Sequence, residues 1–214
     1  LAIGQTDIMR LIAYTSISHF GFIVLGIFAM TTTGGSGSTL YMVNHGFTTA
    51  ALFLFAAMLI QRRGSKRIAD YGGWQRVTPA LAGAFLIAGL SGLGLPGLGA
   101  FNAEFLTLVG TFQRYQVAAV VATIGIILAA LYILLMYKRM MTGPVPESAV
   151  GTPDLGAREK WVVVPIIALF LVLGFYPQPV LDIINPAVRT TLTYVGVADP
   201  APVVPVAAVQ GGSK

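Results

Sequence analysis

The stretch that decides the fold reads Gly92-Leu93-Gly94-Leu95-Pro96-Gly97-Leu98-Gly99-Ala100-Phe101-Asn102-Ala103-Glu104-Phe105. Its first half is rich in Gly and Pro, the residues that most readily interrupt a helix. Its second half carries Glu104, the only charged residue between Val77 and Gln113. An ionisable group in an apolar run is costly in a membrane and therefore indicates a functional site. Glu104 beside a helix break is thus the first candidate residue, and its acidic group suggests that the protein moves protons.

The composition is that of a membrane protein. Of the 214 residues, 56% are hydrophobic and only 10% are charged, and the mean hydropathy is +0.79. A soluble domain carries roughly a quarter charged residues. No Asp, Glu, Lys or Arg lies between Arg10 and Arg62, a distance long enough for two membrane crossings of about 20 residues each. The net charge of +5 is explained by membrane topology, and we expect no nucleic-acid partner.

The sequence offers few ligands for a metal or a redox cofactor. It contains no Cys, which excludes iron–sulfur ligation by this chain and structural disulfides and argues against a zinc site. Its two histidines, His19 and His45, leave little to hold a haem or a metal. We therefore expect no cofactor, no metal and no redox chemistry in this chain.

Hydrophobic runs predict an all-α, polytopic membrane helix bundle. The five predicted spans are residues 11–30, 40–60, 79–112, 117–137 and 161–176. As one straight helix the third would be roughly 51 Å long, far more than a hydrocarbon core of about 30 Å. We therefore predict two half-helices, with the backbone broken within Leu93–Phe101. The Gly/Ser/Thr-rich segment Thr31–Thr39 predicts an external turn between the first two spans.

Basic residues in the loops predict the orientation. Five spans place ten of them on one side: Arg10, Arg62, Arg63, Lys66, Arg67, Arg76, Lys138, Arg139, Arg158 and Lys160. The other side has three, Arg114, Arg189 and Lys214. By the positive-inside rule the N-terminal edge is cytoplasmic and the C-terminus external. We divide the chain into a membrane domain, 1–182, and an external tail, 183–214. The end of the tail, Asp199–Lys214, is expected to be extended. Asp182–Thr193, at the boundary, could form a short interfacial helix, although Pro186 argues against it.

Polar residues cluster inside the spans. His19 lies about 13 Å beyond Arg10 if the segment is helical, which is near mid-membrane. His45 lies in the next span, and Thr48 and Thr49 continue its face one turn deeper. Histidine can donate, accept and change charge near neutral pH, so His19 and His45 join Glu104 as candidates for proton transfer. For Ser16 and Thr48, ordinary hydrogen bonding between helices is the favoured interpretation.

A structural alternative for Glu104 is an ion pair with a basic residue of a neighbouring helix. None of the predicted spans supplies such a residue. We therefore expect the partner of Glu104 to lie in a part of the protein beyond this chain. The chain starts at Leu1, without an initiator Met or the basic start of a signal peptide, and we expect it to be the C-terminal portion of a longer protein.

Four motifs in order resemble one known family. They are Asp7–Phe22 (DIMRLIAYTSISHFGF), Asn44-His45-Gly46 with Ala50–Phe53, Gly94–Phe105, and Gly174–Pro179 (GFYPQP). Together they resemble the antiporter-like subunits of respiratory complex I, the NADH:quinone oxidoreductase, over about residues 5–182. Sister subunits usually carry Lys where this chain has Glu104. The glutamate at this position and the closing motif that ends at Pro179 are both most similar to the subunit M branch of the family. Met9 departs from the family, which often has Lys there.

The resemblance implies a 14-helix fold of two inverted repeats, of which this chain would supply helices ten to fourteen. It implies a proton-translocating membrane-arm subunit in a bacterial plasma membrane, with His19, His45 and Glu104 forming a mid-membrane row and with quinone reduced in other subunits. The partners would be the lipid bilayer, protons and other membrane-arm subunits, including neighbouring antiporter-like ones. Alternatives are a subunit of a multi-subunit cation/proton antiporter or membrane-bound hydrogenase, or a non-transporting scaffold, which would leave Glu104 and its helix break without a purpose.

Overall fold

A computed structural model of the chain describes residues 1–201, and it confirms the predicted all-α class for that part. No strand occurs within these residues; three short 3-10 turns accompany the α-helices. Most of the segment predicted to be extended, Asp199–Lys214, lies outside the described residues. The helices are α1 (Ile8–Phe28), α2 (Thr32–Arg63), α3 (Trp74–Val77), α4 (Pro79–Gly92), α5 (Gly99–Arg114), α6 (Gln116–Met141), α7 (Ala157–Phe175) and α8 (Gln178–Val195).

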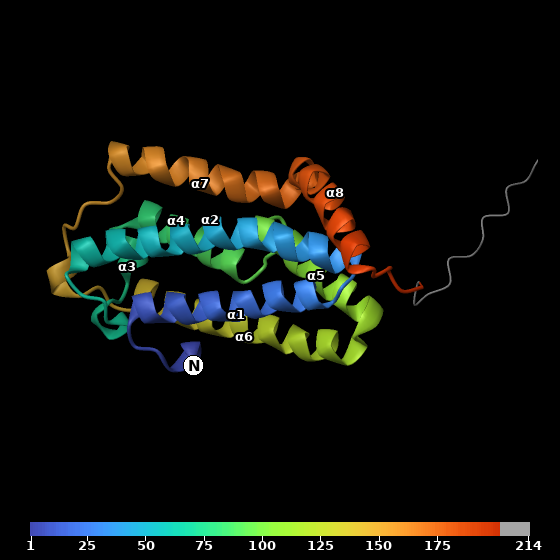
Figure 1. The fold of residues 1–214 in the computed structure, drawn as a ribbon. Coiled ribbons are helices and arrows are strands. Elements are labelled where there is room, and N and C mark those ends of the chain that lie inside the picture. The colour runs from blue at the N-terminus through green and yellow to red at the C-terminus, as the bar shows by residue number, and fades with distance from the viewer. Residues whose placement is uncertain (202–214) are drawn as a thin grey trace, which may run out of the picture.

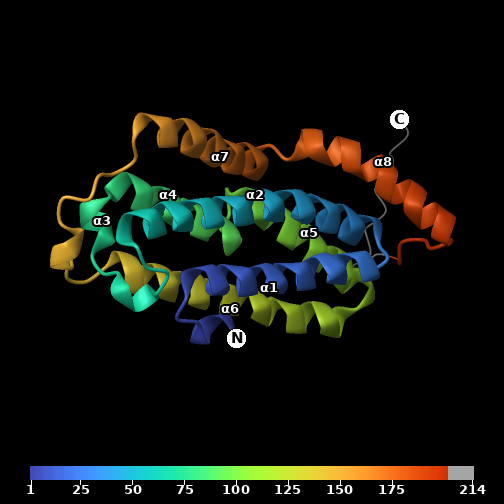
Figure 2. The same cartoon turned by 60° about the vertical axis from the view of Figure 1, so that its left-hand side comes forward.

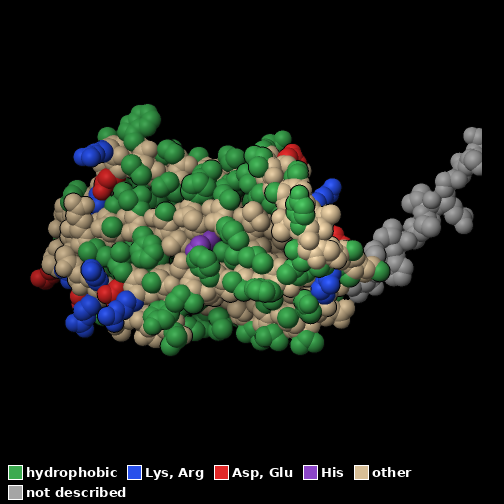
Figure 3. Space-filling model, in the orientation of Figure 1, with side chains coloured by type: hydrophobic (Ala, Val, Ile, Leu, Met, Phe, Trp, Pro, Cys, Tyr) green, Lys and Arg blue, Asp and Glu red, His purple; other side chains and the backbone are tan. Residues whose placement is uncertain are grey.

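The long helices run side by side, and α2 is the central one, in contact with α1, α4, α5, α7 and α8 (Figure 1). Figure 2 shows α6 on one side of this bundle and α7 on the other. The loops 64–73 and 142–156 and the start of α1 meet at one end, called the basic end below. The visible Lys and Arg side chains gather at the two ends and are denser at the basic end (Figure 3). Among residues 1–201, ten Lys and Arg residues lie at the basic end and two at the opposite end. The third basic residue predicted for the opposite side, Lys214, lies outside the described residues.

Every predicted span contains helix, but the helices differ in their capacity to cross a membrane. By length and composition α1, α2 and α6 each suffice alone. Helices α7 and α8 reach the required length and hydropathy only when they are taken together, and the angle between them is 64°. Helix α4 is apolar but too short. Within residues 1–201 this gives three or four candidate crossings, against the five predicted.

The predicted interruption of the third span is confirmed. Helix α4 ends at Gly92 and α5 begins at Gly99, so the backbone leaves the helix within the predicted window. Gly94 and Gly97 have φ values of 71° and 91°, a left-handed conformation that glycine adopts without steric penalty. The Gly/Pro density thus marks a true discontinuity rather than a kink.

The predicted external turn at Thr31–Thr39 is wrong, because α2 already begins at Thr32. Thr31 is its N-cap and accepts a hydrogen bond from the backbone N–H of Gly34. The glycines of this segment serve helix packing: a Cβ on Gly37 would overlap the backbone of Thr107 in α5, and one on Gly110 would overlap Gly34. Small residues let two membrane helices approach this closely.

The predicted tail also needs correction, because the boundary at residue 182 falls inside α8. This amphipathic helix includes the segment proposed as a short interfacial helix and tolerates Pro186. It packs on the end of the bundle opposite the basic end, where Ser36 of α2 donates to the side-chain oxygen of Asn185. Beyond it, Asp199 accepts a hydrogen bond from the backbone N–H of Thr32 (2.7 Å). Residues 183–199 are therefore part of the folded structure.

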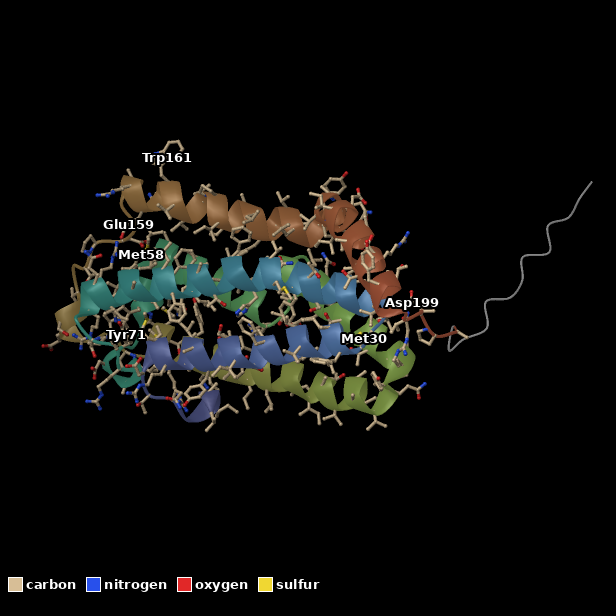
Figure 4. All side chains as sticks on the ribbon, in the orientation of Figure 1. Met30, Met58, Tyr71, Glu159, Trp161 and Asp199 are labelled. Carbon is tan, nitrogen blue, oxygen red and sulfur yellow. The ribbon has the colours of Figure 1, made fainter. Side chains whose placement is uncertain are left out.

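At the basic end, the loop 142–156 ties three helices together. Asp154 accepts hydrogen bonds from the backbone N–H groups of Ala80 and Leu81, so it caps α4 from a distant part of the chain. Arg62, in the last turn of α2, donates to the carbonyls of Pro153 and Asp154 and to the carboxylate of Glu159 in α7. Figure 4 shows Glu159 at this end, above Met58 of α2, with Asp199 at the far end.

Gly37→Ala should destabilise the protein by about 1–3 kcal/mol, because the added methyl group would push α5 away from α2. The matched control is Gly83→Ala in α4, where a Cβ would meet nothing within 4 Å. Thermal unfolding of the full-length protein in detergent compares the two variants. Equal melting temperatures would show that the close approach of α2 and α5 does not matter for stability.

The Arg62–Glu159 pair should make stability depend on pH. The hydrogen bond from Arg62 (2.6 Å) lowers the pKa of Glu159 below its ordinary value of 4.5. The contribution of the ion pair to stability is therefore complete at pH values above 4.5, and it is lost as the pH falls through the lowered pKa of Glu159. Glu159→Gln should lower stability at pH 7 by less than about 1 kcal/mol, because the pair is partly exposed. The difference from wild type should vanish at low pH, as chemical denaturation at pH 7 and at low pH would measure.

Candidate functional site

The centre of the candidate site is a hydrogen bond between α2 and α5. The hydroxyl of Tyr41 donates to Oε1 of Glu104 at 2.5 Å. Both side chains are buried, with exposed fractions of 0% for Tyr41 and 4% for Glu104. Glu104 thus has a hydrogen-bond partner within this chain, and the expectation of an ionisable partner beyond this chain stays a prediction. The partner is a neutral donor, which satisfies a buried carboxyl group without a second charge.

The two histidines form the next part of the site. Nδ1 of His19 and Nδ1 of His45 are 3.2 Å apart, so one imidazole donates and the other accepts. The rings of His19 and Tyr41 have centroids 5.8 Å apart, which brings the histidine pair beside the Tyr41–Glu104 bond. Exposed fractions of 3% for His19 and 7% for His45 show that both side chains are buried.

Hydroxyl groups complete the row at His45. Ser16 lies 2.9 Å from Nε2 of His45, and Thr49 lies 3.2 Å from Nδ1. A histidine side chain is visible at the surface about halfway along the bundle (Figure 3). The row therefore runs from Glu104 through Tyr41 and His19 to His45, and it approaches the surface of this chain at mid-length.

The helix break shapes the pocket around Glu104. A Cβ on Gly94 would overlap Oε2 of Glu104, so the break presses its backbone against the carboxyl group. On the other side of α5, a Cβ on Gly99 would overlap the side-chain oxygen of Asn44. Glycine is required at position 94 for two reasons, its left-handed φ and its contact with the carboxyl group.

Helix α7 supports the break from outside. Asn102, two residues before Glu104, donates to the carbonyls of Leu173 and Gly174 at 3.2 and 2.7 Å. A Cβ on Gly174 would overlap the carbonyl of Gly97 within the break. Through these contacts the end of α7 fixes both the break and the first turn of α5.

Thr48 and Ser91 join α2 to α4 through a buried hydroxyl pair 3.0 Å apart. Thr48 binds neither histidine, so in this structure it matches the alternative of hydrogen bonding between helices. Ser16 does contact His45, which places it in the row. Within residues 1–201 no group of three or more His, Cys, Asp or Glu side chains could hold a metal ion.

Comparisons with known proteins identify the family. Residues 1–130 match the family described as "NADH:quinone oxidoreductase/Mrp antiporter, TM". The chain belongs to this family. It is also 61% identical, over its whole length, to NADH-quinone oxidoreductase subunit M of Mycobacterium tuberculosis, and 41% identical over 88% of its length to that of Rhodobacter capsulatus. The resemblance to subunit M seen in the sequence motifs is thus confirmed.

Two solved structures share the fold. A chain of respiratory complex I from Thermus thermophilus with bound NADH matches 92% of this chain with a TM-score of 0.85 and 30% identity. A chain of the Mrp complex from Dietzia sp. matches 91% with a TM-score of 0.75 and 24% identity, a likeness in fold alone. The chain spans 39% and 37% of the length of the two subunit M relatives and 41% and 45% of these structural relatives.

Tyr41 is the main residue that sequence reasoning missed. It lies four residues before His45, so the two share a helix face, and this spacing is a signal that the sequence contains. A tyrosine near the end of an apolar segment is, however, also typical of an interfacial anchor. Ser91, at the end of α4, was missed for a similar reason, since a serine beside glycines reads as part of a turn.

Gly94→Ala should destabilise this family member by about 1–3 kcal/mol and displace Glu104. Gly143→Ala is the matched control, because Gly143 has a φ of 97° but open space around a Cβ. Gly94→Ala should lower the free energy of unfolding more than the control does. In a double-mutant cycle, this difference should disappear when Glu104 is replaced by Ala. An excess that persists there would mean that the contact with the carboxyl group is not its cause.

Proposed function

We propose that this chain is part of a proton-translocating membrane-arm subunit of an NADH:quinone oxidoreductase. The observation that carries the proposal is the buried Glu104 carboxyl group, bonded to Tyr41 and followed by two histidines at mid-bundle. The 61% identity to a subunit M supports it. Quinone reduction belongs to other subunits, and this chain contributes the path for protons.

Each member of the row has a group suited to passing a proton. A carboxyl group can hold a proton and release it, and a hydroxyl can accept one proton while donating another. In the histidine pair, a proton that arrives at one ring can leave from the other, and the shared Nδ1 contact sets which ring is the donor. The proposed path for protons therefore leads from Glu104 through Tyr41 and His19 to His45, and its widest step is between the rings of Tyr41 and His19, whose centroids are 5.8 Å apart.

The row has to continue beyond this chain, because His45 approaches the surface of the chain with Ser16 and Thr49 around it. The family resemblance implies lysines on earlier helices of the full-length protein, and we propose that such lysines extend the row. Proton uptake and release would then depend on charge movements along the membrane arm. The partners in this proposal are neighbouring membrane-arm subunits, including other antiporter-like ones, and the lipid bilayer.

We place the basic end in the cytoplasm of a bacterial cell and the α8 end outside. Ten Lys and Arg side chains at the basic end against two among the described residues at the other support this orientation. The arrangement of α8 also fits, since an amphipathic helix bent by 64° from a membrane helix suits the plane of the membrane surface.

Glu104→Gln should leave assembly nearly intact and reduce proton pumping, and the coupled quinone reductase activity, by at least about tenfold. The amide has a similar shape but cannot hold and release a proton. Glu104→Asp should retain part of the activity, and Tyr41→Phe should lower it, because the carboxyl group loses its donor. NADH-driven proton uptake in vesicles with matched amounts of assembled complex measures all three variants.

Thr48→Val is the control, since Thr48 contacts Ser91 rather than the row, and it should pump normally. Full pumping by Glu104→Gln would refute the proposed role. Repeating the measurement with and without sodium separates proton translocation from the antiporter alternative, which predicts that pumping depends on sodium.

A further inference from the structure

The basic end carries more cations than its own carboxylates can neutralise. Beside its ten Lys and Arg residues it has five carboxylates: Asp7, Asp70, Glu147, Asp154 and Glu159. Three of these have structural tasks, because Asp7 caps α1, Asp154 caps α4 and Glu159 pairs with Arg62. Among residues 1–201 the Arg62–Glu159 pair is the only ion pair. Most cations of this end are therefore left to attract an anion from outside the chain.

A pocket of about 380 Å³ lies at this end, where three segments of the chain meet. It is lined by Arg139 in the last turn of α6 and by Gln5, Thr6, Ile68, Ala69 and Tyr71. Backbone hydrogen bonds join two of the segments: the N–H of Ile68 donates to the carbonyl of Thr6 at 2.8 Å, and the N–H of Ile8 donates to the carbonyl of Lys66 at 3.0 Å. The pocket thus has walls of paired backbone and a guanidinium group among its lining side chains.

The side chains of this pocket suit a phosphate group. Arg139 is exposed and forms no ion pair with any described residue, and a guanidinium group can donate two parallel hydrogen bonds to one phosphate. The hydroxyl of Thr6 and the amide of Gln5 add neutral donors. Two further cations adjoin the lining residues in sequence, Arg67 before Ile68 and Lys138 before Arg139. The positive charge is therefore concentrated at this pocket.

An apolar stripe on the outside of α6 leads to the same place. Its side chains have exposed fractions between 44% and 67%, and they are Val120, Ile124, Ile127, Leu131 and Leu134. Their alternating spacing of four and three residues places them on one helix face, and the next position of that face is Lys138. Figure 3 shows hydrophobic side chains along the lower edge of the molecule, where α6 runs in Figure 1, and Lys and Arg side chains at its left end.

We propose that this pocket binds the phosphate group of an anionic phospholipid, whose acyl chains lie along the stripe of α6. Lys and Arg clusters at the end of a membrane helix attract anionic lipids. The stripe favours a lipid over a soluble phosphate compound, because only a lipid has chains that can cover exposed apolar side chains beside the pocket. The inference goes beyond the proposed function and does not depend on the role of Glu104.

The test places a photoreactive side chain in the pocket of the full-length protein, within the assembled complex. Ala69→p-benzoylphenylalanine is suitable because Ala69 is exposed and lines the pocket. The complex is irradiated in vesicles of equal parts phosphatidylglycerol and phosphatidylcholine, and mass spectrometry identifies the crosslinked lipid. Phosphatidylglycerol should be crosslinked at least about fivefold more often, the preference that one basic residue near a membrane surface provides. Equal crosslinking of the two lipids would overturn the proposal.

Arg139→Gln should reduce this preference by about fivefold. The matched control is Arg158→Gln, which removes the same charge from the same end but at the start of α7, on the other side of the bundle (Figure 2). It should keep the wild-type preference. An equal loss in both variants would mean that the total charge of the basic end selects the lipid, and an unchanged preference in Arg139→Gln would exclude the guanidinium group; either result overturns the site.

A second probe position shows the preference of the probe itself. Val164→p-benzoylphenylalanine, on the exposed face of α7, should crosslink the two lipids in their bulk ratio. If the Arg139→Gln complex does not assemble, Thr6→Glu decides with Thr6→Gln as its control. The carboxylate should repel the phosphate and lower the preference at Ala69, whereas the amide should not, and equal preferences in the two variants overturn the proposal. Loss of the lipid crosslink on adding excess inorganic phosphate would instead assign the pocket to soluble anions.

Discussion

A carboxyl group inside a bilayer needs a hydrogen-bond donor, and the bond from Tyr41 to Glu104 meets that need. Much of the structure follows from it. Tyr41 belongs to α2 and Glu104 to α5, so these helices have to lie within a single hydrogen bond of each other. Glycines at their interface, Gly37 and Gly110, leave room for this approach because any Cβ there would overlap the opposite backbone. The central position of α2 in the bundle is a result of the same constraint.

The break between α4 and α5 is supported at several points along the bundle. Beside the break itself, Gly174 packs against Gly97, and Asn102 donates a hydrogen bond to the end of α7. At the basic end, Asp154 caps the start of α4, and Arg62 holds the loop that carries Asp154. Unpaired backbone groups are unfavourable in a membrane, and these contacts explain how an irregular segment can persist there. The irregular backbone thus becomes one wall of a defined site.

Sequence reasoning found the features that a linear pattern can display. Glu104 stood out as a single charge in an apolar run, and the break stood out by its glycines and Pro96. Tyr41 could not be found in this way, because its partner lies 63 residues further along the chain and depends on how α2 and α5 pack. Thr31–Thr39 was misread because glycine and serine are typical both of turns and of close helix contacts. Pro186 concealed the length of α8, since sequence alone does not show whether packing compensates for a proline.

The contact between Asn102 and α7 has a consequence for biosynthesis. Asn102 and its acceptor Leu173 are separated by 71 positions in the chain. During translation α5 therefore leaves the ribosome well before the helix that supports its first turn. Until α7 is made, the irregular segment before α5 lacks its final contacts. Its polar backbone groups then need hydrogen bonds from water or from the insertion machinery. The surroundings of Glu104 are complete only after α7 has been synthesised, so α7 sets the time at which the break and the first turn of α5 acquire their final contacts.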